Sequence, residues 1–567
     1  MRWALAGLFV LMHLQAFSQL ALVASFFPFL DAIATSGESV GNGFGIALRW
    51  FPEITDSARI GLFGGFVIAA VVVSNFLGAL HGIAMARFFA TLDSHISNRL
   101  LRGYLMRPYS YHLNRNSSEF MRNIFSETDL VTGGFLDSAL GACSAALTII
   151  GIGALLFFMN PLITLAAGIF FAGSYAAIYF LVRRRLVKAA EERADSDDAR
   201  YQAVSEAFDS IKVLKVLGRE EFFANAFERP SRNYFYNLEK AQLYSAIPKH
   251  VVETIAFSGM VIIALLLFQR SGGVAGALPV LGVFAVAGYR LLPAIKGFYA
   301  SVSNLRYYQG SVETIFEACN EPESSVEVSE DPSTRLPFQK TIEFRNVSFA
   351  YPGSDRQVLR NLDLTIPVRA RIGLCGRSGV GKTTLADLVL GLFEPVSGAI
   401  LIDGVPLSAK NRRAWQRNCG YVPQEISLID GSIRSNIAFG IEGEQIDDEK
   451  VVAAARMANL DEFVKELPDG YETEVGEGGV RLSGGQRQRI GIARALYHDP
   501  EVIVLDEATS ALDYETEEAI VDALRSLAGR KTVIMIAHRH STIRESDFLI
   551  HLENGQITKK AAEILRS

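Results

Sequence analysis

The nine residues that decide the fold read Gly376-Arg377-Ser378-Gly379-Val380-Gly381-Lys382-Thr383-Thr384. An apolar run at residues 372–375 precedes them and is typical of a short buried strand, and residues 385–390 are typical of a helix start. A glycine-rich turn between a strand and a helix is the context that a phosphate-binding loop requires. Its glycines let the backbone bend around an anion, so that successive N–H groups point inward.

Two side chains in this loop supply the remaining chemistry of an anion site. Lys382 offers a mobile positive charge to the β- and γ-phosphates of a nucleotide, and Thr383 offers a hydroxyl to Mg²⁺. The start of the following helix adds a partial positive charge. The alternative is a glycine-rich turn with no ligand, and the downstream sequence argues against it.

The chain is too long, at 567 residues, for a single ordinary domain. Hydrophobic residues make up 49% of it and charged residues 20%, and long apolar runs are confined to roughly the first 300 residues. The net charge of −6 predicts no nucleic-acid partner. The four cysteines have neither metal-binding nor disulfide spacing; they are Cys143, Cys319, Cys375 and Cys419.

Six apolar runs are interpreted as membrane helices, since a helix of about 20 residues crosses about 30 Å of hydrocarbon. They are Trp3–Leu30, Gly61–Met85, Gly134–Met159, Leu162–Val182, Thr254–Phe268 and Ala275–Tyr299. The alternative for the first run is a cleaved secretory signal, but the run continues well past the possible cleavage point. The sequence therefore predicts a six-helix membrane domain over residues 1–320.

Basic residues gather in two long connections between these runs, at residues 86–131 and 183–252. The opposite connections hold few basic residues, so the positive-inside rule places both termini and the nucleotide site in the cytoplasm, with the chain in the cytoplasmic membrane. Long connections without structure are uncommon, so we expect the membrane helices to continue far beyond the bilayer. Separate soluble insertions are the alternative.

Arg290 lies about fifteen residues into the last predicted span, roughly 22 Å along a helix, where a charge normally faces a partner, a cavity or a ligand. An anionic substrate is one interpretation, and a structural ion pair with Glu253 is the other. Lys249 and Lys296 are weaker substrate candidates, because snorkelling to the membrane interface explains both of them.

An acidic stretch at residues 321–340 predicts a solvated linker to a second domain, residues 341–567. That domain begins with an alternating strand, residues 341–351, and Tyr351 at its end is a candidate to stack on adenine. A later apolar strand ends in Asp506 and Glu507. Because ligands bind at the carboxyl ends of such strands, Asp506 is predicted to hold Mg²⁺ and Glu507 to orient or deprotonate the attacking water.

A second glycine-rich turn, Leu482-Ser483-Gly484-Gly485-Gln486, opens another helix. One chain carries one such pair of turns. A γ-phosphate can therefore lie between the phosphate loop of one copy and the Ser483 turn of another.

The segment from about Thr341 to Ser567 resembles the nucleotide-binding domain of ATP-binding-cassette (ABC) transporters. The resemblance is carried by the phosphate loop and five further motifs in the family's order, namely Tyr421–Gln424, Leu482–Gln486, Val502–Glu507, Ser510–Asp513 and Ala537–Arg539. It implies an α/β P-loop fold that uses ATP and Mg²⁺ and hydrolyses ATP. It also implies that Tyr351 stacks on adenine.

The same resemblance assigns roles to the other site residues. Gln424 senses Mg²⁺ and the lytic water, Ser483 and Gly485 clamp the γ-phosphate across a dimer, and Asp513 links the two sites. His538 contacts the γ-phosphate, and Glu507 is the catalytic carboxylate. The chain departs from the pattern at Gly478, where many exporters have an arginine; this bears on a contact between domains rather than on hydrolysis.

The membrane half resembles the exporter class of this family. In that class short coupling helices at the tips of the long connections contact the nucleotide-binding domains, which here implies about Tyr111–Glu119 and Asp209–Arg219. A narrower resemblance, carried by Tyr289–Pro293, Asn304–Tyr308 and a possible outer helix at Phe44–Phe51, is to bacterial flippases of lipid-linked oligosaccharides. A basic residue of those flippases has no counterpart near Ser74.

These inferences together predict one half of a homodimeric exporter that hydrolyses ATP to flip or export an amphiphilic, lipid-linked anion across the bilayer. The alternatives are an exporter of drugs, other lipids or peptides, and a membrane-anchored ATPase that regulates a partner without transport.

Overall fold

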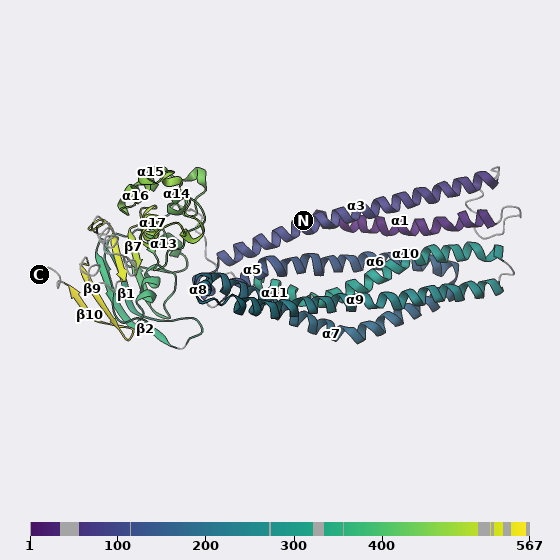
Figure 1. Ribbon diagram of the computed structural model, residues 1–567, viewed down its shortest axis with the longest axis horizontal. Coiled ribbons are helices and arrows are strands. Elements are labelled where there is room, and N and C mark those ends of the chain that lie inside the picture. Colours follow the sequence, from purple (N-terminus) through teal and green to yellow (C-terminus); the bar gives the residue numbers. More distant parts are fainter. Residues whose placement is uncertain are drawn as a thin grey trace. The chain divides into compact units, whose positions relative to one another are not determined.

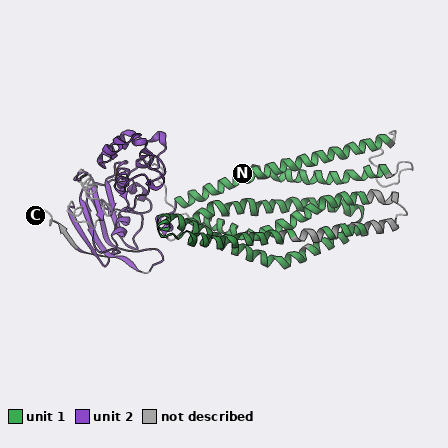
Figure 2. Cartoon of the chain, in the orientation of Figure 1, with its two compact units in different colours: residues 1–105, 115–321 green, residues 106–114, 322–567 purple. Residues whose placement is uncertain are grey.

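The computed structural model describes residues 2–34, 56–113, 115–270, 274–320, 334–354, 356–507, 527–536 and 546–562, together with Asp522 and Arg525. The chain divides into two compact units (Figure 2). Unit 1 contains residues 1–105 and 115–321, and unit 2 contains residues 106–114 and 322–567. A short segment from the first half of the chain thus belongs to the same unit as the nucleotide motifs.

Unit 1 consists of helices, and its long helices lie side by side (Figure 1). They are α1 (Arg2–Ala34), α3 (Asp56–Leu105), α6 (Asp137–Met159), α7 (Pro161–Asp209), α9 (Glu220–Arg270) and α10 (Val274–Tyr307). The shorter elements are α5 (Ser117–Arg122), the π-helices η1 (Asn123–Glu127) and η2 (Leu130–Leu136), α8 (Ile211–Leu217) and α11 (Gln309–Asn320). The helical fold predicted for this half is confirmed.

Five helices among the described residues are long and apolar enough to cross a membrane, which makes this a membrane protein. They match five of the six predicted spans, and the helix holding the sixth, α9, has no described side chains at residues 262–270. The long connections are helical as expected, because α3 and α7 continue for 50 and 49 residues. The outer segment Phe44–Phe51 lies outside the described residues.

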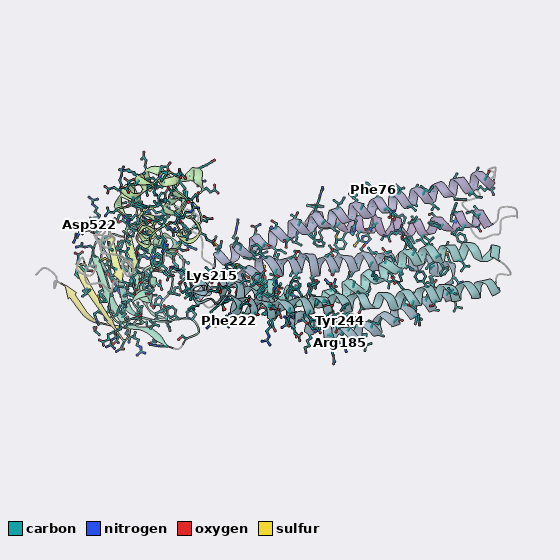
Figure 3. The ribbon with its side chains drawn as sticks, in the orientation of Figure 1. Phe76, Arg185, Lys215, Phe222, Tyr244 and Asp522 are labelled. Atoms are coloured by element: carbon teal, nitrogen blue, oxygen red, sulfur yellow. The ribbon has the colours of Figure 1, made fainter. Side chains whose placement is uncertain are left out.

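The centre of the helical unit is packed with small and branched apolar side chains. Val23, Ile152, Val283 and Ala287 are fully buried and come from α1, α6 and α10. The outward face is also apolar, and Phe76 of α3 projects from it with 65% of its surface exposed (Figure 3). An apolar exterior around an apolar core is expected of helices that face lipid.

A buried charged pair joins η1 to α7 beyond the predicted bilayer. Arg193 is 2% exposed and lies 3.8 Å from a carboxylate oxygen of Glu127. The rings of Tyr234 and Tyr307 lie within 6 Å of its guanidinium group and add cation–π contacts. Breaking one partner of such a pair would leave an uncompensated buried charge, so the pair favours one arrangement of these helices.

Unit 2 contains two sheets. The smaller sheet is antiparallel in the order β2-β1-β4-β5, formed by β1 (Thr341–Ala350), β2 (Gln357–Pro367), β4 (Ser397–Ile402) and β5 (Val405–Pro406). The larger runs β10-β9-β3-β8-β7-β6, formed by β3 (Arg371–Cys375), β6 (Cys419–Val422), β7 (Val502–Asp506), β8 (Thr532–Ile536), β9 (Phe548–Glu553) and β10 (Gln556–Ala562). The α/β fold predicted for this half is confirmed.

Strands β9, β3, β8, β7 and β6 are parallel to one another, and β7 and β8 are buried along their whole length. This explains why their sequences are continuous apolar runs rather than alternating ones. The helices α12 (Lys382–Val389) and α17 (Gly484–Leu496) follow glycine-rich turns. The remaining helices are α4 (Tyr109–Leu113), α13 (Arg412–Gln416), α14 (Ile433–Ile437), α15 (Asp448–Met457) and α16 (Asp461–Glu466), with one-turn 3₁₀ helices η3 (Gly443–Gln445), η4 (Gly470–Glu472) and η5 (Glu477–Gly479).

Asp403 anchors the start of β1. Its carboxylate accepts hydrogen bonds from the backbone N–H groups of Gln339, Lys340 and Thr341, at 2.6, 2.8 and 2.8 Å. Burial alone would raise the pKa of Asp403, but these donors outweigh burial and hold the pKa below its ordinary value. The ionised carboxylate therefore stabilises unit 2.

We predict that Asp403→Asn destabilises unit 2 by about 1–2 kcal/mol at pH 7, because charge-assisted hydrogen bonds are lost. The depressed pKa means that this stabilisation is present above the ordinary carboxyl pKa and is lost as the pH falls through the folded-state value. Urea unfolding followed through buried Trp415, in a Trp3→Phe/Trp50→Phe background, measures the effect. The exposed Glu466→Gln variant is the control. If the free energy of unfolding of Asp403→Asn differs from that of the native chain by as much at pH 3 as at pH 7, the ionised Asp403 carboxylate is not the source of the stabilisation.

Candidate nucleotide-binding site

The phosphate loop connects β3 to α12 through a backbone that requires glycine. Gly376 has φ +146°, and a Cβ atom there would lie 2.4 Å from the carbonyl oxygen of Leu552 and 3.0 Å from Val380. No side chain fits this position without moving the backbone. The close approach sets the point at which the chain leaves the sheet and turns into the loop.

Lys382 is folded over this loop. The side chain is buried, and its Nζ donates hydrogen bonds to the carbonyl oxygens of Gly376 and Arg377, at 2.9 and 3.1 Å. The ammonium charge therefore lies at the centre of the loop, beside the first turn of α12. This combination of a full charge and a helix start suits a polyphosphate.

Tyr351 follows β1 and lies beside the same helix. Its hydroxyl is 2.9 Å from the hydroxyl of Thr384, and its ring contacts the edges of Phe349 and Phe393, with centroids 5.2 and 5.6 Å away. The structure thus holds the proposed adenine-stacking ring next to the phosphate loop, in a fixed orientation.

The acidic side chains lie at the end of β7, as the sequence predicted. Asp506 is buried and accepts a hydrogen bond from the Thr383 hydroxyl, and burial together with neighbouring Glu507 raises the pKa of Asp506. Gln424 Nε2 donates to a carboxylate oxygen of Glu507 at 2.8 Å. Thr383, Asp506, Glu507 and Gln424 are therefore brought together from three separate segments.

Glu507 has an unusual backbone for a residue with a side chain, with φ +47°. Its N–H donates to the carbonyl oxygen of Ile536 at 3.0 Å, so the pairing with β8 includes the first residue after β7. A positive φ in a non-glycine residue persists where the surroundings impose it, often at a functional site. The turn directs the carboxylate toward Gln424.

Oxygen groups of the kind that Mg²⁺ prefers converge beside the loop. Thr383 contributes a hydroxyl, Asp506 a carboxylate and Gln424 an amide carbonyl, and Asp506 already contacts Thr383. Hard oxygen ligands at a phosphate site fit Mg²⁺, which is bound by one or two protein groups and the phosphates. The residues present therefore fit the expected metal.

The second glycine-rich turn is a capped helix start. Ser483 Oγ accepts from Gln486 N at 3.2 Å, and the Gln486 side chain accepts from Ser483 N at 2.8 Å, which forms a capping box at α17. Ser483 and Gly484 are exposed, whereas Gly485 is buried. The capping box thus fixes the N-terminus of α17 through its own side chains.

Some predicted site residues cannot be placed. His538 and Asp513 lie outside the described residues, and the side chain of Lys249 does too. Arg290 is half-buried in α10, and no ion pair or hydrogen bond of its side chain occurs within the described part of the chain, so the alternative ion pair with Glu253 is not observed there. Lys296 is exposed on the same helix.

Sequence reasoning missed an acidic residue close to the metal candidates. Asp387 is buried, and burial together with Asp506 raises the pKa of Asp387 to about 6. It follows Thr383 by four residues on α12, so helical spacing alone places both on one face. The spacing of four residues from Thr383 is the sequence signal that could have identified Asp387.

Models of known protein families match segments of both units. The model of the ABC transporter transmembrane region matches residues 8–285, and the ABC transporter model matches residues 359–510. The chain is 32% identical to the ATP-dependent lipid A-core flippase of Pseudomonas aeruginosa over 88% of this chain and 80% of that protein. This chain belongs to the ABC transporter family.

Two further relatives agree on the architecture of this ABC transporter. This chain is 29% identical to the heterocyst differentiation ATP-binding protein HepA of Nostoc sp., over 97% of this chain and 92% of that protein. A solved bacterial Atm1-family ABC exporter with ATP bound shares the fold, with a TM-score of 0.81, 24% identity, and coverage of 99% and 95%. The chain is an exporter-type half-transporter and an ATPase coupled to transport.

We predict that Gly376→Ala weakens ATP binding at least tenfold, because the new Cβ atom would force the phosphate loop away from Leu552. Gly379→Ala is the matched control, since φ is also positive there but nothing lies within 4 Å of the added atom. Equilibrium binding of labelled ATP to the purified transporter measures the ATP affinity of the two variants. Equal losses in the two variants would show that backbone strain, not the close approach, matters.

Proposed function

We propose that two copies of this chain form a homodimeric flippase in the cytoplasmic membrane. Its substrate is an amphiphilic anionic lipid, such as a lipid-linked oligosaccharide. The observation that carries this proposal is Arg290, a half-buried cation in a membrane helix with no partner among the described residues. Relatives named as lipid A-core flippases support a lipid substrate.

The nucleotide site supports a division of labour among its side chains. Lys382 and the loop backbone bind the phosphates, while Tyr351 stacks on the base. Thr383, Asp506 and Gln424 would hold Mg²⁺, which when bound neutralises phosphate charge. Glu507, positioned by Gln424, orients the attacking water and accepts its proton.

The exposed Ser483 turn supports a site completed by a second copy. Its capped helix start presents N–H groups and a hydroxyl that suit a γ-phosphate on the facing chain. By family resemblance, His538 contacts that phosphate and Asp513 links the two sites. ATP then draws the two nucleotide units together, and hydrolysis releases them. ATP shifts the equilibrium between separated and associated units by the difference in its affinity for these two states.

The substrate would meet a set of basic groups near one side of the bilayer. Arg290 provides the contact within the span, and Lys249 and Lys296 lie toward the end where basic residues gather. That distribution supports a cytoplasmic nucleotide unit and a headgroup that is picked up from the cytoplasmic leaflet.

Reconstitution in vesicles tests the transport proposal against its rivals. ATP-dependent movement of labelled lipid-linked oligosaccharide across the membrane supports it. Movement of drugs alone would indicate a multidrug exporter, and ATP hydrolysis without movement of any substrate would indicate a regulatory ATPase.

We predict that Glu507→Gln lowers ATP turnover at least 100-fold and leaves ATP affinity within about threefold, because the amide keeps the geometry but cannot accept a proton. Phosphate release and labelled-ATP binding measure the two effects. Glu501→Gln is the control, because Glu501 is only half-buried and precedes β7 at the opposite end from Glu507. Turnover near the native rate would remove Glu507 from its proposed role.

We predict that Arg290→Ala lowers transport of an anionic lipid-linked sugar at least tenfold, while ATP hydrolysis without substrate stays within about twofold. Arg290→Lys keeps the charge and should retain part of the transport, and Lys296→Ala should have a smaller effect because Lys296 is exposed. Undiminished transport in Arg290→Ala would exclude this contact.

A further inference from the structure

Phe393 is an aromatic junction inside unit 2. It follows α12 and is 5% exposed. Its ring contacts three others, with centroid distances of 5.1 Å to Phe349, 5.6 Å to Tyr351 and 5.6 Å to Tyr109. Tyr109 and Tyr351 thus contact the same buried ring, although 242 positions separate them in the chain.

The Tyr351 end of this junction is fixed. The ring meets Phe393 at an interplanar angle of 90° and Phe349 at 81°, and its hydroxyl is held by Thr384. These edge-to-face contacts set the plane on which a base would stack. A rotation of the Tyr351 ring therefore also displaces the ring of Phe393.

The Tyr109 end belongs to the segment of residues 106–114, which continues directly from the long helix α3. Tyr109 is 43% exposed, and its ring contacts Phe393. Burial, then Asp387, then Tyr351 raise the pKa of Tyr109, which places its hydroxyl near both groups. Burial, then Asp506, then Asp387, with a smaller contribution from Tyr109, raise the pKa of Tyr421, which lies three residues before Gln424.

We propose that Phe393 is a positioning residue that couples stacking of the nucleotide base on Tyr351 to packing of Tyr109. The segment after α3 is then held more firmly when the base is bound. This rests on the proposed role of Tyr351 in binding adenine. Coupling between two sites is reciprocal, so packing of Tyr109 must in turn strengthen ATP binding. ATP affinity therefore reports on the junction.

A double-mutant cycle tests the coupling. The full-length transporter in lipid nanodiscs binds labelled ATP in EDTA, which prevents turnover, and affinity is measured for Tyr109→Leu, Tyr351→Leu and the double variant. We expect Tyr351→Leu to weaken binding about tenfold and Tyr109→Leu about threefold, as loss of ring contacts would. The double variant should bind no more weakly than Tyr351→Leu alone.

Two further variants separate positioning from general damage. Tyr109→Phe keeps the ring and should bind ATP like the native chain, whereas Phe393→Leu should remove the effect of Tyr109→Leu. Leu113→Ala, an exposed change on the same helix, should leave affinity unchanged.

The possible results test the coupling through Phe393 and the role of Tyr351 in base binding separately. Independent, multiplicative losses in the double variant would overturn the coupling while leaving Tyr351 as the base-binding residue. A native affinity in Tyr351→Leu would overturn that premise and the inference with it. A loss in Tyr109→Phe equal to that in Tyr109→Leu would show that the hydroxyl, not the ring, carries the effect, and would overturn the aromatic route.

Discussion

The carboxyl ends of β3 and β7 lie at one edge of the central sheet, and the nucleotide site depends on this arrangement. Both strands leave the sheet through a residue with positive φ, Gly376 at +146° and Glu507 at +47°. The first turn forms the phosphate loop, and the second directs a carboxylate toward Gln424. The parallel pairing through β8 fixes the separation of the two turns, so the loop around Lys382 and the carboxylate of Glu507 are held in one frame.

The parts of the site that the sequence predicted are those encoded locally. The phosphate loop, the strand ending in Asp506 and the capped turn at Ser483 each combine residue type with a neighbouring strand or helix, and each was found where expected. The long helices α3 and α7 were also predictable, because their apolar and charged stretches join without a helix-breaking segment.

The parts that escaped prediction depend on contacts between distant segments. The family resemblance implied a coupling helix at about Tyr111–Glu119, and residues 106–114 share a compact unit with the nucleotide motifs. The residue types alone do not show which side chains meet there, since an aromatic residue such as Tyr109 or Phe393 fits many surroundings. The burial of Arg193 against Glu127 was equally hidden, because the two lie on different helices and each alone is typical of an exposed surface.

The capping box at Ser483 restricts which residue type can occupy that position. The serine oxygen accepts from Gln486 N through one lone pair, and its O–H remains available to donate, which is the polarity a phosphate oxygen needs. Aspartate would start the helix equally well but would repel the anion, and alanine would lose the cap. A hydroxyl reconciles helix initiation with anion recognition, so local folding and ligand chemistry impose the same selection on this atom.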